Sequence, residues 1–128
     1  MTDFNQPATS GQALSAGHIE HHQNLADGLY EVTAATVSGT YTVPVGACHD
    51  VTMTGATTFT FTAPSSSIGT VSSSFMLRLS GAYTPTWPAA VKWDGGTPPT
   101  YTTPALYVFT TVDSGTTWLG SQVGKGFA

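Results

Sequence analysis

Residues 57 to 62 read TTFTFT, and this short stretch decides the fold. Phe59 and Phe61 alternate with threonines, the period-two pattern of a strand with one buried face and one solvated face. Between residues 74 and 80 the same alternation returns, with Phe75, Leu77 and Leu79 at every second position. Such strands are typical of a sandwich whose sheets are wet on one side, rather than of a parallel sheet buried on both faces.

The period-two pattern extends outward from these two segments over most of the chain. Further strands are expected at 30 to 37, 40 to 45, 48 to 54, 105 to 113 and 116 to 123, with a short strand at 90 to 93. Asp113-Ser114-Gly115 predicts a hairpin turn, and the Pro- and Gly-rich stretch from 83 to 104 predicts a long excursion. About eight strands at this spacing predict a mainly β domain over residues 30 to 128, an antiparallel, jelly-roll-like β-sandwich.

Residues 1 to 29 follow a different pattern. The first dozen residues predict an extended N-terminal arm, and Gln12 to Leu29 is the only helix-compatible segment, which Gly28 would end. Apolar and histidine side chains recur along this predicted short helix at helical spacing. We expect this segment to attach the protein or to make it oligomerise through five positions, Ile19, His22, Leu25, Ala26 and Leu29.

Low charge is the main feature of the composition. Only 8% of the residues are charged and threonine is the commonest residue, so hydroxyl groups must supply solubility. The predicted edge strands lack the Lys and Glu that normally discourage association between strands. The predicted short helix would be only marginally stable alone. The uncharged edges and this helix together favour assembly with copies of the same chain, and we expect a homotrimer.

Several classes of partner are disfavoured. With a net charge of −4 and only three basic residues, the chain offers no cationic patch for nucleic acid. No window reaches the length of a transmembrane helix, and the start of the chain has no secretory leader pattern. The lone Cys48 excludes an internal disulfide. These features predict a protein made in a cytoplasm-like environment, with neither nucleic acid nor membrane as a partner.

No enzyme or cofactor site is predicted. His18 and His22 lie four residues apart on one helical face, so they are the only candidate metal ligands, although a helix surface holds such histidines equally well. Cys48, His49 and Asp50 are consecutive on a strand and point to alternate faces, which rules out a catalytic relay. We expect a packed thiol beside two surface polar groups. The acidic residues are scattered singly, which gives no paired carboxylates.

Four aromatic residues of the Pro-rich excursion are candidates for binding. Stacked on one surface, these rings would suit a sugar, whereas buried rings would fill the core or an interface, where tyrosine and tryptophan are both common. The set consists of Tyr83, Trp87, Trp93 and Tyr101.

The last third of the chain carries a recognisable pattern. The run VKWDGGTPPT at 91 to 100 is followed by FTT at 109 to 111 and DSGTTWLG at 113 to 120. This order resembles the C-terminal module of minor tail and tail fibre proteins of tailed bacteriophages. The family usually has Pro at the position of Asp94, Gly at that of Ser114 and an aromatic residue at that of Leu119.

The resemblance implies a structural protein of a phage particle that works by adhesion or scaffolding and is typically trimeric. A small minor tail or tail fibre component, assembled in the host bacterial cytoplasm with other virion proteins, is therefore the favoured hypothesis. A decoration protein or head fibre on the capsid is the first alternative. A lectin-like module that binds a host surface glycan is the second.

Overall fold

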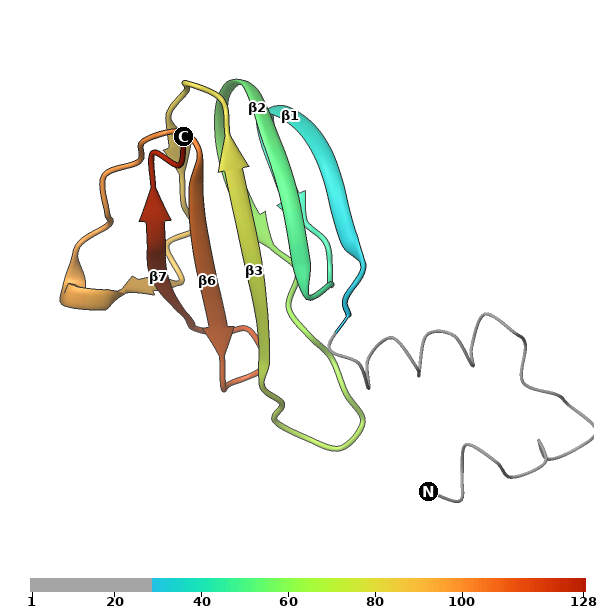
Figure 1. The fold of residues 1–128 in the computed structure, drawn as a ribbon. Coiled ribbons are helices and arrows are strands. Elements are labelled where there is room, and N and C mark those ends of the chain that lie inside the picture. Colours follow the sequence, from blue (N-terminus) through green and yellow to red (C-terminus); the bar gives the residue numbers. More distant parts are fainter. Residues whose placement is uncertain (1–28) are drawn as a thin grey trace, which may run out of the picture. The chain divides into compact units, whose positions relative to one another are not determined.

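The computed structural model describes residues 29 to 128 and shows a mainly β domain, which confirms the predicted fold class at this level (Figure 1). The predicted arm lies outside the described residues, as does the predicted helix apart from Leu29. The strands are β1 (Val32–Val43), β2 (Cys48–Phe61), β3 (Ser73–Ser80), β4 (Pro85–Thr86), β5 (Val91–Trp93), β6 (Ala105–Thr111) and β7 (Trp118–Lys125). A 3-10 turn, η2 (Asp94–Gly96), follows β5.

All seven strands belong to one mixed sheet. Its order is β1-β2-β3-β6-β7-β5, and β4 pairs separately with β2. The pairs β1-β2, β2-β3, β2-β4 and β5-β7 are parallel, whereas β3-β6 and β6-β7 are antiparallel. The prediction of an antiparallel fold is therefore wrong for four of these six pairings, although the predicted hairpin at residues 113 to 115 does join the antiparallel strands β6 and β7.

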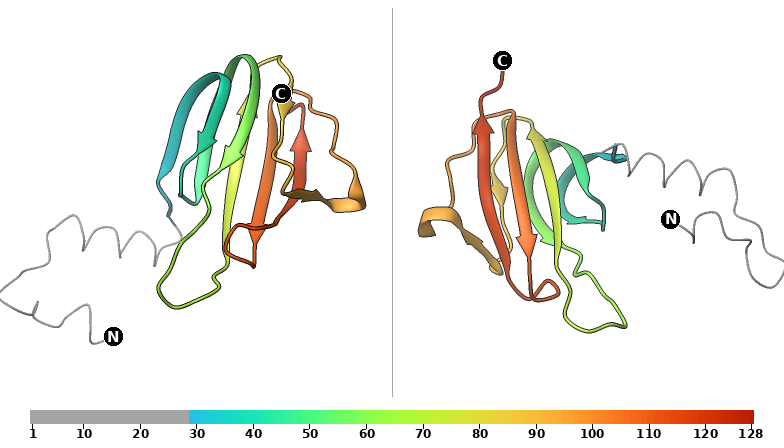
Figure 2. Two further views of the ribbon diagram at one scale, coloured as in Figure 1. Left: turned by 180° about the vertical axis from the view of Figure 1, so that it is seen from behind. Right: turned by 60° about the horizontal axis from the view of Figure 1, so that its bottom comes forward.

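Chain length explains how β1 and β2 can be parallel neighbours. A straight strand of 12 residues would be about 40 Å long, and a parallel partner normally needs a crossover of a dozen or more residues. Only residues 44 to 47 separate β1 from β2. Each strand therefore bends back on itself, so that its end returns close to its beginning (Figure 2).

The bends fall at residues that we expected to end strands. The β1-β2 register shifts between Val37 and Gly39, and Gly39 has a φ of +72°, which is readily accessible to glycine. On β2 the corresponding corner contains Gly55. The predicted strands 30 to 37 and 40 to 45 are thus two arms of β1, and 48 to 54 and 57 to 62 are two arms of β2.

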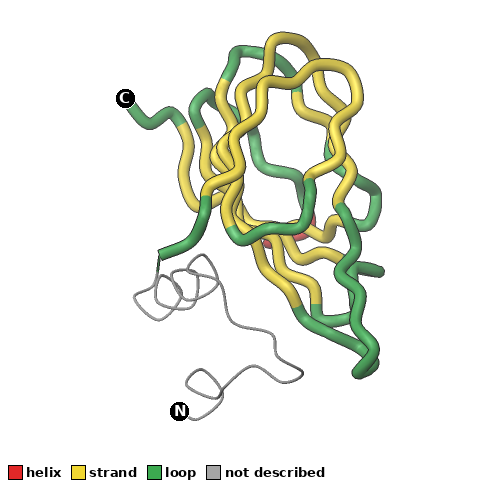
Figure 3. Tube along the Cα trace, turned by 90° about the vertical axis from the view of Figure 1, so that its right-hand side faces the viewer, coloured by secondary structure: helices red, strands yellow, loops and turns green. Residues whose placement is uncertain are grey.

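Bending arranges the strands as successive turns of a coil, seen end-on in Figure 3. Cys48 pairs with Val32 on one side and with Met76 on the other, so the first arms of β1 and β2 align with β3. Past the corner, Thr58 pairs with both Thr40 and Thr86, so the second arms align with β4. The sheet thereby forms two facing layers.

Aromatic side chains fill the space between the layers. Phe61, on the second arm of β2, contacts Phe75 of β3 at 5.0 Å, Phe109 of β6 at 4.8 Å and Trp118 of β7 at 5.5 Å, measured between ring centroids. Phe59 is fully buried. Both phenylalanines of TTFTFT therefore pack in the core, as their alternation predicted. Full burial of such a ring, as at Phe59, contributes about 2 to 3 kcal/mol.

A glycine pair offers a test of this close packing. Gly81 has a φ of +104°, and an added Cβ would collide with the backbone carbonyl of Met53, whereas Gly69, at +109°, faces open space. We expect Gly69→Ala to cost about 1 kcal/mol of unfolding free energy through backbone strain alone. Gly81→Ala should cost about 3 kcal/mol or more. Urea denaturation followed by tryptophan fluorescence measures both, and equal losses would contradict this account of the corner at Met53.

Candidate functional site

The Pro-rich excursion forms a groove of about 580 Å³ beside β4 and β5. Its walls are mostly prolines and apolar side chains, with one cationic group, Lys92. Because β4 and β5 are short, strand pairing holds little of this segment. Its prolines, whose φ angles are fixed, restrict much of the remaining backbone. The lining residues are Pro85, Thr86, Trp87, Pro88, Ala89, Val91, Lys92, Trp93, Gly96 and Pro98.

Trp87 connects the groove to the core. Its ring stacks on Phe59 at 5.0 Å with an interplanar angle of 18°. It also contacts Tyr107 at 4.8 Å, Phe109 at 5.3 Å and Trp93 at 5.6 Å. Four aromatic neighbours hold this indole in place, so its first role is to fill the space between the layers.

Trp93 is held in a similar way. Its ring lies 5.6 Å from Phe109 and 6.0 Å from Tyr107. Gly120 makes room for it, since a Cβ there would come within 3.1 Å of Trp93 Cε3 and 2.9 Å of Val91 Cγ1. Gly120, the last residue of the run DSGTTWLG, therefore permits the close approach of β5 to β7.

The other two candidate aromatics do not line this groove. The Tyr101 hydroxyl donates a hydrogen bond to the carbonyl of Gly81 at 2.7 Å, and burial raises the pKa of this phenol. Tyr83 is 47% exposed. The structure thus brings Trp87 and Trp93 together and leaves Tyr83 and Tyr101 outside the groove.

Threonines coat the outer side of the layer formed by the second arms and β4. Thr40, Thr58 and Thr86 occupy one row across the three strands, and all three are exposed. In the next row the hydroxyl oxygens of Thr42 and Thr60 are 2.7 Å apart and share a hydrogen bond. No charged residue occurs in β1, β4 or the second arm of β2. Sequence alternation predicted the outward threonines but not that parallel register would align them.

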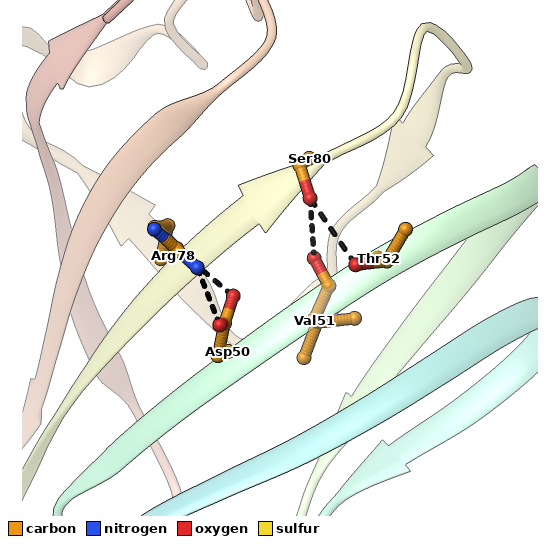
Figure 4. A network of polar contacts seen from close by, with 5 residues as sticks. All are labelled: Asp50, Val51, Thr52, Arg78 and Ser80. Carbon is orange, nitrogen blue, oxygen red and sulfur yellow. Dashed lines mark hydrogen bonds and ion pairs between the residues drawn. The ribbon is translucent and has the colours of Figure 1, made fainter.

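The outer side of the opposite layer carries an ion pair. Arg78 Nε and a terminal nitrogen of Arg78 donate to the two carboxylate oxygens of Asp50 at 2.9 and 2.5 Å (Figure 4). Beside it, the hydroxyls of Thr52 and Ser80 lie 3.3 Å apart. Both ionic side chains are exposed to a substantial degree, so water screens this pair and it adds little to stability. It leaves this face electrically neutral around β2 and β3.

The turn between β6 and β7 is stabilised by its own side chains. Asp113 accepts hydrogen bonds from the Thr111 hydroxyl and the Thr117 amide, each at 2.8 Å. These bonds, that from the Thr117 amide above all, lower the pKa of the Asp113 carboxyl. Ser114 adopts a φ of +57°, and its hydroxyl accepts a hydrogen bond from the Val71 amide at 2.9 Å. Ser114 therefore occupies a backbone conformation that suits the glycine expected there from the phage module.

Comparisons with known proteins found no match. No protein-family model, curated protein or solved structure matches the chain.

His49 departs from its predicted surface position. Because alternate residues of β2 face the core, this side chain is fully buried, while Asp50 points outward to Arg78. The ring donates from Nε2 to the carbonyl of Gly46 at 3.2 Å and packs edge-on against Phe75. Nδ1 is buried without a hydrogen-bond partner, and burial lowers the pKa of the imidazole. The expectation of a surface polar group at His49 is therefore wrong, whereas Cys48 is half-buried and unpaired, and the three residues form no relay.

Most of the remaining predicted site residues lie outside residues 29 to 128, the part of the chain that the structure describes. His18, Ile19, His22, Leu25 and Ala26 precede residue 29, and Leu29 is 57% exposed and outside any helix. Within residues 29 to 128, no three His, Cys, Asp or Glu side chains come together as a metal site. In the same range, no helix is long and apolar enough to cross a membrane.

Buried His49 predicts a pH dependence of stability. A histidine with a lowered pKa in the folded state takes up its proton first in the unfolded chain, so its contribution is complete above about pH 6.5 and is lost as the pH falls through the folded pKa. His49→Leu removes this titration, and at pH 7.5 it costs about 1 kcal/mol for the lost hydrogen bond.

We therefore expect the urea midpoint of the wild-type protein to fall more between pH 7.5 and pH 5 than that of His49→Leu. The histidines at 18, 21 and 22 are present in both proteins and cancel in the difference. Parallel pH profiles would show that burial of the imidazole has no effect on folding.

Proposed function

We propose that this chain is a non-enzymatic structural component of a tailed-phage particle, a small minor tail or tail fibre protein. The observation that carries the proposal is the chemistry of its outer faces. Rows of threonine cover the outer side of the layer formed by the second arms and β4, and around β2 and β3 a threonine-serine pair lies beside two charges that pair with each other. Uncharged, hydroxyl-rich faces on a strand framework suit permanent contact with other proteins better than turnover of a substrate.

The resemblance of residues 91 to 120 to the phage module supports the same proposal. The segments that carry it, VKW, FTT and the turn with DSGTTWLG, are neighbours in the fold, because β5 and β6 both pair with β7. In this proposal the two-layered, sandwich-like domain is the exposed body of the subunit. Residues 1 to 29 form the arm and helix that attach it to other virion proteins and hold a homotrimer together.

The test is to locate the chain in phage particles. Lysates of the bacterium that carries this gene would be fractionated on a density gradient and probed with an antibody against the chain. We expect the chain to remain with intact particles at a fixed copy number, and with tails when heads and tails are separated. Recovery with heads would favour the capsid decoration protein instead. Presence only among soluble lysate proteins, where a host cytosolic enzyme serves as the marker, would contradict a virion role.

A receptor-binding role is the second candidate, and the groove beside β4 and β5 favours it. Indole edges, proline rings and one lysine form a surface that a host glycan could contact. We expect a glycan array to give binding that Lys92→Ala weakens by roughly fivefold, whereas Lys125→Ala should leave it unchanged. Silence across the array, or equal effects of the two substitutions, would count against this role.

A further inference from the structure

Strand β1 lies at one end of the sheet and has one edge that no described strand covers. Within residues 29 to 128, β1 pairs with β2 alone. Its 12 residues, VTAATVSGTYTV, include no charged residue and no proline. Proteins usually protect an edge of this length with lysine, proline or a covering segment, because its free backbone groups pair with any suitable strand.

Hydrogen bonds show which backbone groups of β1 face outward. The carbonyl of Val43 accepts from the Thr62 amide at 3.1 Å, and the carbonyl of Val37 accepts from the Thr54 hydroxyl at 3.2 Å. Odd-numbered residues thus direct their carbonyls toward β2. Since backbone groups alternate along a strand, the amides and carbonyls of the even-numbered residues face the open edge. Between the start of the strand at Val32 and its end, and leaving out Ser38 at the bend, these residues are Ala34, Thr36, Thr40 and Thr42.

The shape of β1 restricts what can pair with it. The strand bends at Ser38 and Gly39, near its middle, so a straight strand could follow only one of its two arms. A partner that follows both arms must have the same bend at the same place. A second copy of β1 that runs in the opposite direction meets this condition. The two arms of β1 are of nearly equal length, so the bends of the two copies coincide.

We propose that two copies of this chain pair β1 to β1, antiparallel, about a two-fold axis at Ser38. In this register Thr36 lies opposite Thr40 of the second copy, and Ala34 lies opposite Thr42 of the second copy. Each of these is a pair of outward-facing residues that exchange two hydrogen bonds. With the symmetry-related pairs, the contact forms about eight backbone hydrogen bonds.

The side chains agree with this register. On the inner side Ala35 would lie opposite Tyr41 of the second copy, and Val37 opposite Gly39 of the second copy, so that a small residue meets a larger one in each pair. Ala35 and Tyr41 already pack against the core of their own subunit. The pairing therefore extends the two layers and the core from one subunit into the next, as edge pairing does within a sheet.

A head-to-tail ring would be a poorer match. It would need β1 of one copy to pair with the other end of the sheet, which is β5, a strand of three residues. A two-fold contact uses the same long edge twice and closes on itself. It involves only β1 and so can coexist with a trimeric contact made by residues 1 to 29.

Paired substitutions at exposed positions test the register. Thr36 and Thr40 are exposed in the monomer, so charges there should leave folding intact. T36K/T40K would place lysine opposite lysine twice across the two-fold axis. T36K/T40E would place lysine opposite glutamate twice. An equimolar mixture of T36K/T40K with T36E/T40E also gives opposite charges in every opposed pair, and its separate components serve as the like-charge controls. Like charges directly opposite destabilise a strand pair and unlike charges stabilise it.

Light scattering of the full chain at micromolar concentration gives the readout. We expect an even-numbered wild-type species, half that mass for T36K/T40K and for T36E/T40E alone, and the original mass for their equimolar mixture. The dissociation constant of each variant alone should be at least about tenfold higher than that of the mixture. Circular dichroism confirms that both variants fold.

Three results would overturn the pairing: a wild-type protein that is monomeric or odd-numbered, an oligomer whose mass the charges do not change, or separate variants that fail to recombine. The first two are expected if residues 1 to 28 of the same chain cover the β1 edge. The proposed particle role is tested separately by fractionation, so either proposal can fail without the other.

Discussion

The bend shared by β1 and β2 is the constraint on which the rest of the structure depends. Four residues cannot carry the chain from the end of a straight 12-residue strand back to its start, so both strands must fold over for β2 to begin beside Val32. Gly39 makes the turn possible in β1, and a corner containing Gly55 follows it in β2. Once both strands have folded over, the second arm of β2 faces β3, β6 and β7, and Phe61 can reach Phe75, Phe109 and Trp118.

Parallel register then determines the outer surface. In successive turns of a coil, residues of like position come to lie side by side, so an alternating Thr-x-Thr sequence becomes rows of hydroxyls that cross several strands. The same register brings Asp50 beside Arg78, where each charge neutralises the other. On the second arms and around β2 and β3, a chain with few charged residues thus presents surfaces that are polar yet carry almost no net charge. Such faces do not repel further copies of themselves.

The sequence predicted the faces of the strands better than their directions. The alternation in TTFTFT identified Phe59 and Phe61 as core, because side-chain period depends only on local backbone geometry. Period two is the same in parallel and antiparallel sheets, so it could not reveal that β1, β2 and β3 are parallel. Gly39 and Gly55 predict strand ends, because a glycine at a corner and a glycine in a loop look alike in sequence. At two residues, β4 was too short to show any period.

The candidate site was harder to predict because it depends on contacts distant in sequence. The Pro-rich segment marks Trp87 and Trp93 as candidates together with Tyr83 and Tyr101. Only the fold shows that the two tryptophans lie together and that Phe59, Tyr107 and Phe109 surround them. The polarity of His49 predicts a surface position, whereas its odd-numbered position on β2, which it shares with buried Val51 and Met53, places it in the core. The same alternation, followed along β1, explains why its even-numbered residues combine exposed side chains with outward backbone groups. An uncharged edge that bends at its midpoint is complementary to its own copy, and that property follows from register and curvature together rather than from any single residue.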